Sequence, residues 1–393
     1  MGGDHESATL SALSAAAFPY NGSYCSRRSL SNMLNSSPQY KFLFNPYDRD
    51  LILSIDGGGM RGVIALAILC WLEEQTGRPA YELFKLVGGT STGAIICAGL
   101  GLGMSAREIM DDVYKARLPK AFNRAKRLRW LRFLLNGLRH LYPYGPFLKS
   151  LGPLGEGKRL ADLDGPTILL TTKDLRTSST YYIINRGPGA PLFADWPLAG
   201  AVAASVAAPL FLPPVQGNLV DGGVGAFGNP CLATAVEAVE YLDMPADKLL
   251  HISLGNGYFP NTYGEGAGKG FWLKSWIEYV IAEGLDDAAL QQVFMTRAIY
   301  RSMDFRRYNP ELTAENIRHN LDLDIGDIDP GALALDSCST AEIELMERIG
   351  YAYAAKIDWM KERALPWNTI GGHAEPGYEH SDWTNSPFAA QKF

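Results

Sequence analysis

Residues 51–62 read LILSIDGGGMRG, an apolar stretch that runs directly into three consecutive glycines. The apolar residues 51–55, followed by a glycine turn, are typical of a short buried strand. Apolar residues recur at helical spacing over 60–76, and Gly77 and Pro79 follow, so a helix is predicted to end there. The stretch therefore predicts a strand, a tight turn and a helix, the opening unit of an α/β protein.

The following residues repeat this order. A second strand is predicted at 83–88, and an enclosed apolar helix at 92–102. This alternation indicates a parallel sheet with right-handed crossovers. We expect an α/β protein with three α/β/α layers around a central, mostly parallel sheet. Later strands are predicted at 166–175, 180–186, 218–223 and 247–257, and helices at 197–207, about 270–303 and 340–364, the last with a Ser339/Glu342 capping box.

Composition excludes several classes of protein. Hydrophobic residues make up 47% of the chain and charged residues 20%, as in ordinary globular proteins. No run of 18 apolar residues is present, so no membrane-spanning helix is predicted. The five cysteines lack close pairs, which argues against a disulfide framework and a zinc site. The N-terminus lacks the basic residues of a secretory signal, and we expect a cytoplasmic protein.

The glycines of the opening stretch indicate an anion-binding turn. Gly57, Gly58 and Gly59 let the backbone turn tightly and expose its N–H groups at a helix N-terminus, where a phosphate or a transient oxyanion is stabilised. An alternative is the dinucleotide-binding pattern G-x-G-x-x-G, which Gly57, Gly59 and Gly62 also fit. That pattern needs an acidic residue at the end of the second strand, where this chain has glycines instead, so it is disfavoured.

A second glycine-flanked turn carries a candidate nucleophile. Residues 89–93 read GTSTG and place Ser91 between a predicted strand and a predicted helix, with Gly89 and Gly93 on either side. Nucleophilic serines occupy strained turns of this kind. The alternative is an ordinary turn in which Thr90 or Ser91 caps the helix. Because neighbouring parallel strands end at one edge of the sheet, Ser91 and the first glycine turn are expected to lie together.

A carboxylate is predicted at the same edge. In LVDGG (219–223), Asp221 ends a strand and precedes Gly222 and Gly223. Its side chain should therefore reach the edge where the other two turns lie. Alternatively, Asp221 only stabilises a tight turn, because Asp-Gly is a common turn signal.

Together these three motifs resemble the patatin-like phospholipases, a family of serine acyl hydrolases that use a Ser–Asp dyad. DGGGMRG (56–62), GTSTG (89–93) and DGG (221–223) carry the resemblance, and ASVAAPLFLPP (204–214), GNP (228–230) and ISLGNG (252–257) reinforce it over about residues 50–310. It implies a patatin-like fold and hydrolysis of phospholipid or other glycerolipid esters without metal or cofactor. It also implies Ser91 as nucleophile, Asp221 as general base, an oxyanion loop of Gly57, Gly58, Gly59 and Arg61, and supporting glycines at 89, 93, 222 and 223.

Two alternatives to this function stay open at the level of sequence. The first is a Ser-His-Asp triad, whose histidine would follow the acid in conventional chain order and would be His251, His319, His373 or His380. His251 lies in an apolar strand and is more typical of a core histidine. The second is a catalytically silent module that binds a lipid or a nucleotide on the same fold.

Positive charge is concentrated in one segment. The net charge is −6, yet residues 113–150 contain ten Lys or Arg and no Asp or Glu. Residues 128–139 predict a basic amphipathic helix, which suits either an anionic lipid surface or packing on the protein, and peripheral membrane contact is expected over 124–142. No nucleic-acid-binding motif accompanies the charge, so nucleic acid is not expected as a partner.

The predicted domain organisation is simple. We expect an irregular arm over 1–45, a catalytic domain over 46–365 that includes the basic insertion 113–150 and the C-terminal helices, and a loop-like tail over 366–393. No internal repeat is present. The sequence gives no indication of oligomeric state.

Overall fold

The structure is a computed structural model of the 393-residue chain. It describes residues 49–126, 140–152, 154, 157–225, 227–260, 270, 272, 287–357 and 359. The predicted arm (1–45), the tail (366–393) and the amphipathic helix (128–139) lie outside the described residues.

A seven-stranded sheet forms the centre of the described domain. Its strand order is β4-β3-β2-β1-β6-β7, with β5 also paired to β3. All pairs are parallel except those that β3 makes with β4 and β5. The predicted, mostly parallel sheet is confirmed. The strands are β1 (Asp50–Ile55), β2 (Leu86–Gly89), β3 (Thr167–Asp174), β4 (Ser179–Ile184), β5 (Leu219–Asp221), β6 (Leu249–Leu254) and β7 (Asp304–Tyr308).

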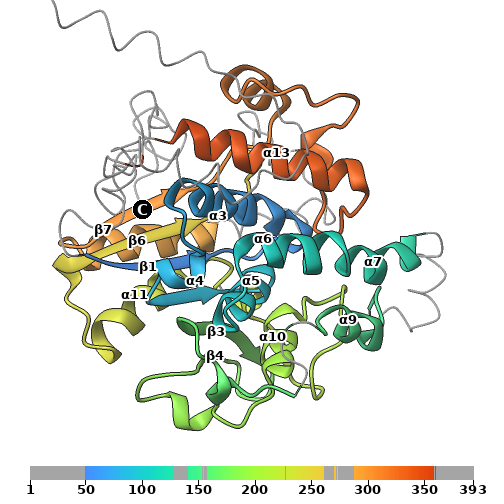
Figure 1. Cartoon of the computed structure of the whole chain (residues 1–393). Coiled ribbons are helices and arrows are strands. Elements are labelled where there is room, and N and C mark those ends of the chain that lie inside the picture. Colours follow the sequence, from blue (N-terminus) through green and yellow to red (C-terminus); the bar gives the residue numbers. More distant parts are fainter. Residues whose placement is uncertain are drawn as a thin grey trace, which may run out of the picture. The chain divides into compact units, whose positions relative to one another are not determined.

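Helices cover both faces of this sheet (Figure 1). Side chains along β1 point alternately to the two faces of the sheet. Leu51, Leu53 and Ile55 join one core cluster, whereas Ile52 joins another. α3 and α13 lie side by side over the first face, and α11 packs on β1 and β2 at the second. The three-layer architecture is therefore confirmed. The longer helices are α3 (Gly62–Thr76), α5 (Thr92–Gly101), α7 (Leu118–Lys126), α9 (Tyr144–Ser150), α10 (Leu198–Val206), α11 (Cys231–Val236) and α13 (Thr340–Lys356), and residues 287–299 are also helical.

Two predicted helices end earlier in the structure. The helix predicted to 303 ends at residue 299, and the chain then forms β7, which the sequence analysis missed. The helix predicted over 340–364 ends at Lys356, although its capping box is present as predicted. It stops because Ile357 is extended and Trp359 turns back to stack on Trp71, with ring centroids 5.7 Å apart.

The described part of the basic insertion packs against the domain. Leu118 on α7 and Phe147 on α9 are buried, whereas Arg117, Lys120 and Lys149 are not. Across the described ranges, the structure contains no helix with the length and apolarity needed to cross a membrane. The insertion therefore contributes apolar side chains to the core as well as charge to the surface.

Candidate active site

The two glycine turns meet at the carboxyl edge of the sheet, as predicted. β1 and β2 are parallel neighbours, and their last residues, Ile55 and Gly89, are in register. The chain leaves β1 through Gly57 and leaves β2 through Ser91. A Cβ atom added at Gly57 would lie only 3.3 Å from the Ser91 Cβ. The glycine loop therefore lies directly beside the candidate nucleophile.

Ser91 has a strained backbone. Its φ of 54° and ψ of −119° are values that residues with a side chain rarely adopt, and its side chain does not cap α5. The flanking glycines permit the turn. A Cβ at Gly93 would lie 2.2 Å from the Ile55 carbonyl oxygen, and one at Gly89 would lie 2.4 Å from the Gly93 carbonyl. This geometry favours the strained catalytic turn over an ordinary capped turn.

The hydroxyl groups of Thr171 and Ser205 hold the turn that carries Ser91. The Thr90 hydroxyl lies 2.6 Å from the Thr171 hydroxyl on β3 and donates to the Phe227 carbonyl, also at 2.6 Å. The Ser91 N–H donates to the Ser205 hydroxyl on α10 over 3.1 Å. The turn that carries Ser91 is consequently held by groups from three other parts of the chain. The sequence analysis assigned no role to Ser205 or Thr171.

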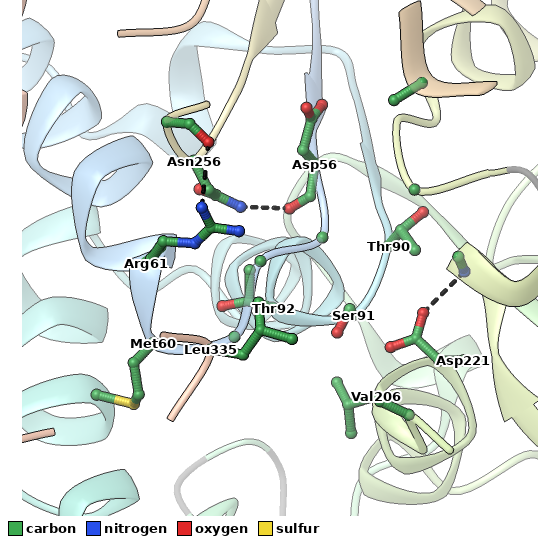
Figure 2. A pocket seen from close by; sticks show the side chains of 18 of the residues that line it. Asp56, Met60, Arg61, Thr90, Ser91, Thr92, Val206, Asp221, Asn256 and Leu335 are labelled. Atoms are coloured by element: carbon green, nitrogen blue, oxygen red, sulfur yellow. Dashed lines mark hydrogen bonds between the residues drawn. The ribbon is translucent and has the colours of Figure 1, made fainter. Parts of the chain in front are cut away.

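Asp221 lies opposite Ser91. Figure 2 shows the two side chains pointing toward one another from different elements. Asp221 ends β5 and is 6% exposed, and its Oδ1 accepts the Gly223 N–H at 2.8 Å. Burial raises the pKa of Asp221 to about 6, opposed by hydrogen bonds from Gly223 and from the Ser91 hydroxyl. Gly222 allows the close fit, since a Cβ there would lie 2.0 Å from the Thr171 hydroxyl.

The glycine loop lines the same cavity as Ser91, and only some of its N–H groups are hydrogen-bonded within the described residues. The Gly57 N–H donates to the Gly228 carbonyl at 2.7 Å, and the next bond along the loop runs from the Met60 N–H to the Leu335 carbonyl, also at 2.7 Å. Between them, the N–H groups of Gly58 and Gly59 have no acceptor among the described residues. Gly59 has a φ of 59°, and a Cβ there would lie 2.1 Å from the Leu335 oxygen. Within the described part of the predicted oxyanion loop, the Gly58 and Gly59 N–H groups are therefore available to donate, whereas that of Gly57 is already bonded.

Arg61 lies at the wall of the site. Its guanidinium donates to the Gly257 carbonyl at 3.5 Å and lies over the Phe259 ring, 5.1 Å from the centroid. Nearby, the Asn256 side-chain amide donates to the Asp56 carbonyl at 2.6 Å (Figure 2). These contacts connect the glycine loop to the segment that follows β6.

Asp56 and Arg307 form a buried ion pair that sequence reasoning did not anticipate. Arg307 on β7 donates to both carboxylate oxygens of Asp56, at 2.8 Å for Oδ1. Burial raises the pKa of Asp56, and the Arg307 guanidinium opposes that rise. The acidic residue of the DGGG motif was visible in the sequence. Its partner gave no local signal, because it lies 251 residues further along the chain.

A cavity of about 1050 Å³ opens above these groups. Ser91, Asp221 and the glycine loop lie in its wall, and most of the remaining lining is apolar. α7 and α9 of the basic insertion contribute Leu118, Phe122 and Phe147 to this lining. Within the part of the chain that the structure describes, no group of three or more acidic, histidine or cysteine side chains could hold a metal ion.

Two of the four histidines that could complete a triad are among the described residues, and neither is at the cavity. His251 is fully buried in β6, with Nε2 3.0 Å from the Ser54 hydroxyl, and burial lowers its pKa to about 3. His319 is exposed on the short helix 316–320. Neither lines the cavity. His373 and His380 lie outside the described residues.

The sequence of this domain matches a known family. The model of the family described as patatin-like phospholipase matches residues 53–234, which include both glycine turns and Asp221. Residues 53–234 therefore form a patatin-like phospholipase domain. This family match indicates a lipid-hydrolysing enzyme.

Relatives of this patatin-like protein include bacterial, plant and animal proteins. It is 29% identical over 271 residues to a cGAMP-activated phospholipase of Vibrio cholerae, covering 61% of this chain and 73% of that one. It is 27% identical over 382 residues to patatin-like protein 2 of Arabidopsis thaliana, covering 84% and 87% of the two chains. Among solved structures, human GIVD cytosolic phospholipase A2 matches with a TM-score of 0.41 and 13% identity, over 83% of this chain and 60% of the human one.

Proposed function

We propose that this protein is a serine acyl hydrolase that cleaves acyl esters of membrane phospholipids or other glycerolipids. Ser91 is the nucleophile and Asp221 is the general base. The observation that carries the proposal is the pairing of a strained serine with a buried carboxylate at the wall of a largely apolar cavity. The relatives named as phospholipases support the choice of a lipid ester as substrate.

The reaction begins with attack of the Ser91 hydroxyl oxygen on the ester carbonyl carbon. The hydroxyl proton passes to the Asp221 carboxylate as the new C–O bond forms. The electron pair of the carbonyl π bond moves to the oxygen, and this oxyanion is stabilised by the N–H groups of Gly58 and Gly59. Collapse of the tetrahedral intermediate expels the alcohol, which receives the proton from Asp221, and leaves an acyl-enzyme on Ser91.

Water completes the cycle by the same route. Asp221 removes a proton from a water molecule as its oxygen attacks the acyl carbon. The second tetrahedral intermediate then expels the Ser91 oxygen, which regains its proton, and the fatty acid is released. The proposed dyad gains from the burial of Asp221, because a pKa of about 6 makes its carboxylate a stronger base than an exposed one.

Where the protein acts follows from its substrate. A membrane lipid is reached from the water phase, so the proposal includes peripheral contact at the membrane. The five cysteines without close pairs favour the cytoplasm as the compartment. The basic segment 124–142 is one candidate for that contact. Binding to vesicles that contain anionic lipid, weakened by salt, would support this part of the proposal.

A short-chain chromogenic ester tests the activity directly. The Ser91→Ala variant should lose about 10³-fold or more in rate. Ser178→Ala is a matched control, because Ser178 also has a φ of 54° but is exposed in the turn between β3 and β4. A fluorophosphonate should also label Ser91 with loss of fluoride, detected as a mass increase on its peptide. Equal rates for wild type and Ser91→Ala would refute the enzyme and favour a silent binding module.

A further inference from the structure

Exposed apolar side chains gather around the mouth of the cavity. Large hydrophobic residues that are strongly exposed are few among the described residues, and five of them line this cavity. They come from five separate segments of the chain. We call them the apolar rim: Leu210 (58% exposed), Val224 (47%), Tyr258 (41%), Leu290 (41%) and Leu335 (37%).

Leu210, the most exposed member of the apolar rim, also has an unfavourable backbone. Its φ is 69°, a conformation in which a bulky residue is a genuine outlier. The conformation is fixed by neighbours, because the Leu210 carbonyl accepts the Leu141 N–H at 2.8 Å and the Phe211 carbonyl accepts the Tyr142 N–H at 2.9 Å. At 58% exposure, packing of the Leu210 side chain offsets little of the cost of this backbone conformation. The fold therefore holds an apolar side chain outward at a conformational cost.

Further apolar residues near Leu210 in the chain also line the cavity. Phe211 and Leu212 follow Leu210 in sequence and also line the cavity, together with Val206 from the end of α10. Ser91 lies in the same cavity wall, and Figure 2 shows Val206 close to Ser91 and Asp221. An acyl chain that entered past the apolar rim would meet these further apolar side chains in the cavity whose wall contains Ser91.

We propose that the apolar rim is the surface through which this protein inserts into a lipid interface, with Leu210 as its principal anchor. This inference rests on the proposed function, since the occupant of the rim must also supply the substrate. A lipid surface covers exposed apolar groups and delivers acyl chains at the same time. A folded protein partner or a second copy of this chain would instead close the mouth over which it bound.

The key variant is Leu210→Asn. Asparagine tolerates a positive φ far better than leucine, so this change removes the apolar anchor without straining the turn. The matched control is Leu192→Asn, because Leu192 is 76% exposed but does not line the cavity. Both are made in the Ser91→Ala background for binding measurements, so that hydrolysis does not alter the vesicles. Sedimentation with sucrose-loaded phosphatidylcholine vesicles keeps attraction by anionic lipid out of the measurement.

Leu210→Asn should weaken partitioning onto these vesicles about tenfold or more, the effect of withdrawing one leucine side chain from an apolar phase. Leu192→Asn should leave it unchanged. The thermal midpoint of Leu210→Asn should be equal to or above that of its parent, which distinguishes a lost anchor from a damaged fold. With Ser91 restored, the ratio of the rate on vesicles to the rate on a monomeric short-chain ester should fall by a similar factor.

Three outcomes would overturn the inference. Equal vesicle binding by the Leu210→Asn variant and its parent is the first, and absence of binding by the parent is the second. The third is a concentration-dependent dimer that Leu210→Asn dissociates, because the rim would then be an interface between copies. Each is separate from failure of the proposed function, which the rate of the wild type on the monomeric ester reports by itself.

Discussion

Arg307 holds Asp56 through both of its carboxylate oxygens, although 251 residues separate them in the chain. The same guanidinium donates to the Ser253 hydroxyl at 3.0 Å. Asp56 is the residue from which the glycine loop departs, and its carbonyl accepts the Asn256 amide. The start of the candidate oxyanion loop is therefore fixed from β6 and β7, which lie outside the matched family region.

Replacing Arg307 by lysine should misplace the oxyanion donors. Lysine keeps the charge but lacks the planar fork that binds both carboxylate oxygens. We expect kcat on a monomeric ester to fall about tenfold to a hundredfold, somewhat less than the loss of a donor itself, with little change in KM. Arg306→Lys is the control, because Arg306 pairs with Asp304 on the same strand and does not line the cavity. Equal losses in both variants would indicate a general effect on folding.

The rate should depend on the ionisation of Asp221. Only the carboxylate form accepts the proton of Ser91, and burial places the pKa of Asp221 at about 6. We therefore expect kcat/KM for a neutral ester to rise with pH through about 6 and to level off above it. A profile measured from pH 4.5 to 8.5 checks this. A rate that is flat down to pH 4.5 would argue that a group other than Asp221 accepts the proton.

Asp221→Asn should abolish turnover and yet stabilise the fold above pH 6. The folded-state pKa of about 6 exceeds the ordinary value of 3.8, so the penalty for ionising Asp221 is absent below pH 3.8 and complete above about 6. Its size is about 3 kcal/mol. Denaturant titrations should show the variant gaining stability at pH 8 and little or nothing at pH 4. Asparagine can still accept the Gly223 N–H, so that hydrogen bond is retained.

Ser91→Gly and Ser91→Ala should both be inactive but should differ in stability. Alanine keeps the Cβ atom and therefore the strain at a φ of 54°, whereas glycine adopts this region freely. We expect the glycine variant to be more stable by about 1 kcal/mol, a typical value for such strain. Urea unfolding of the two variants side by side measures the difference. A more stable alanine variant would show that Ser91 is not strained in solution.

His251→Gln should retain ester hydrolysis, because His251 lies within the sheet and does not line the cavity. The variant should also change how stability depends on pH. The pKa of His251 falls from 6.5 to about 3 on burial, so its contribution is complete above pH 6.5 and is lost progressively as the pH falls toward 3. Glutamine does not titrate in this range, so the unfolding midpoint of the variant should decline less than that of the wild type as the pH falls. Loss of turnover in a well-folded variant would favour the triad.

The sequence predicted those parts of the site that carry a local signal. Glycines beside Ser91 and after Asp56 report close backbone approaches, and these approaches are present in the structure. The order of strands and helices around them predicted the parallel sheet. The strand end before two glycines predicted that Asp221 lies at this edge, and the resemblance to the patatin-like family implied its role as base. Each of these inferences used residues that are neighbours along the chain.

The residues that were missed act through contacts remote in sequence. β7 reads DFRRY, in which three of five residues are charged, so it lacks the apolar pattern of a buried strand. Arg306 is buried and Arg307 is largely enclosed, because Asp304 and Asp56 neutralise them. No property of that pentapeptide reveals that Asp56 is the partner of Arg307. The early end of α13 has a similar origin, since the packing of Trp359 on Trp71 decides it.

β3 is the common reference for both proposed catalytic residues. Gly89, two residues before Ser91, is in register with Leu170, and Asp221 is in register with Thr172 on the same strand. The spacing between nucleophile and base therefore depends on the pairing of β3 with two neighbours, and not on the length of chain that joins them. The connections on either side of β3 can lengthen, shorten or acquire new elements while the dyad geometry stays constant. This arrangement allows substrate preference to diversify in the loops without alteration of the chemistry.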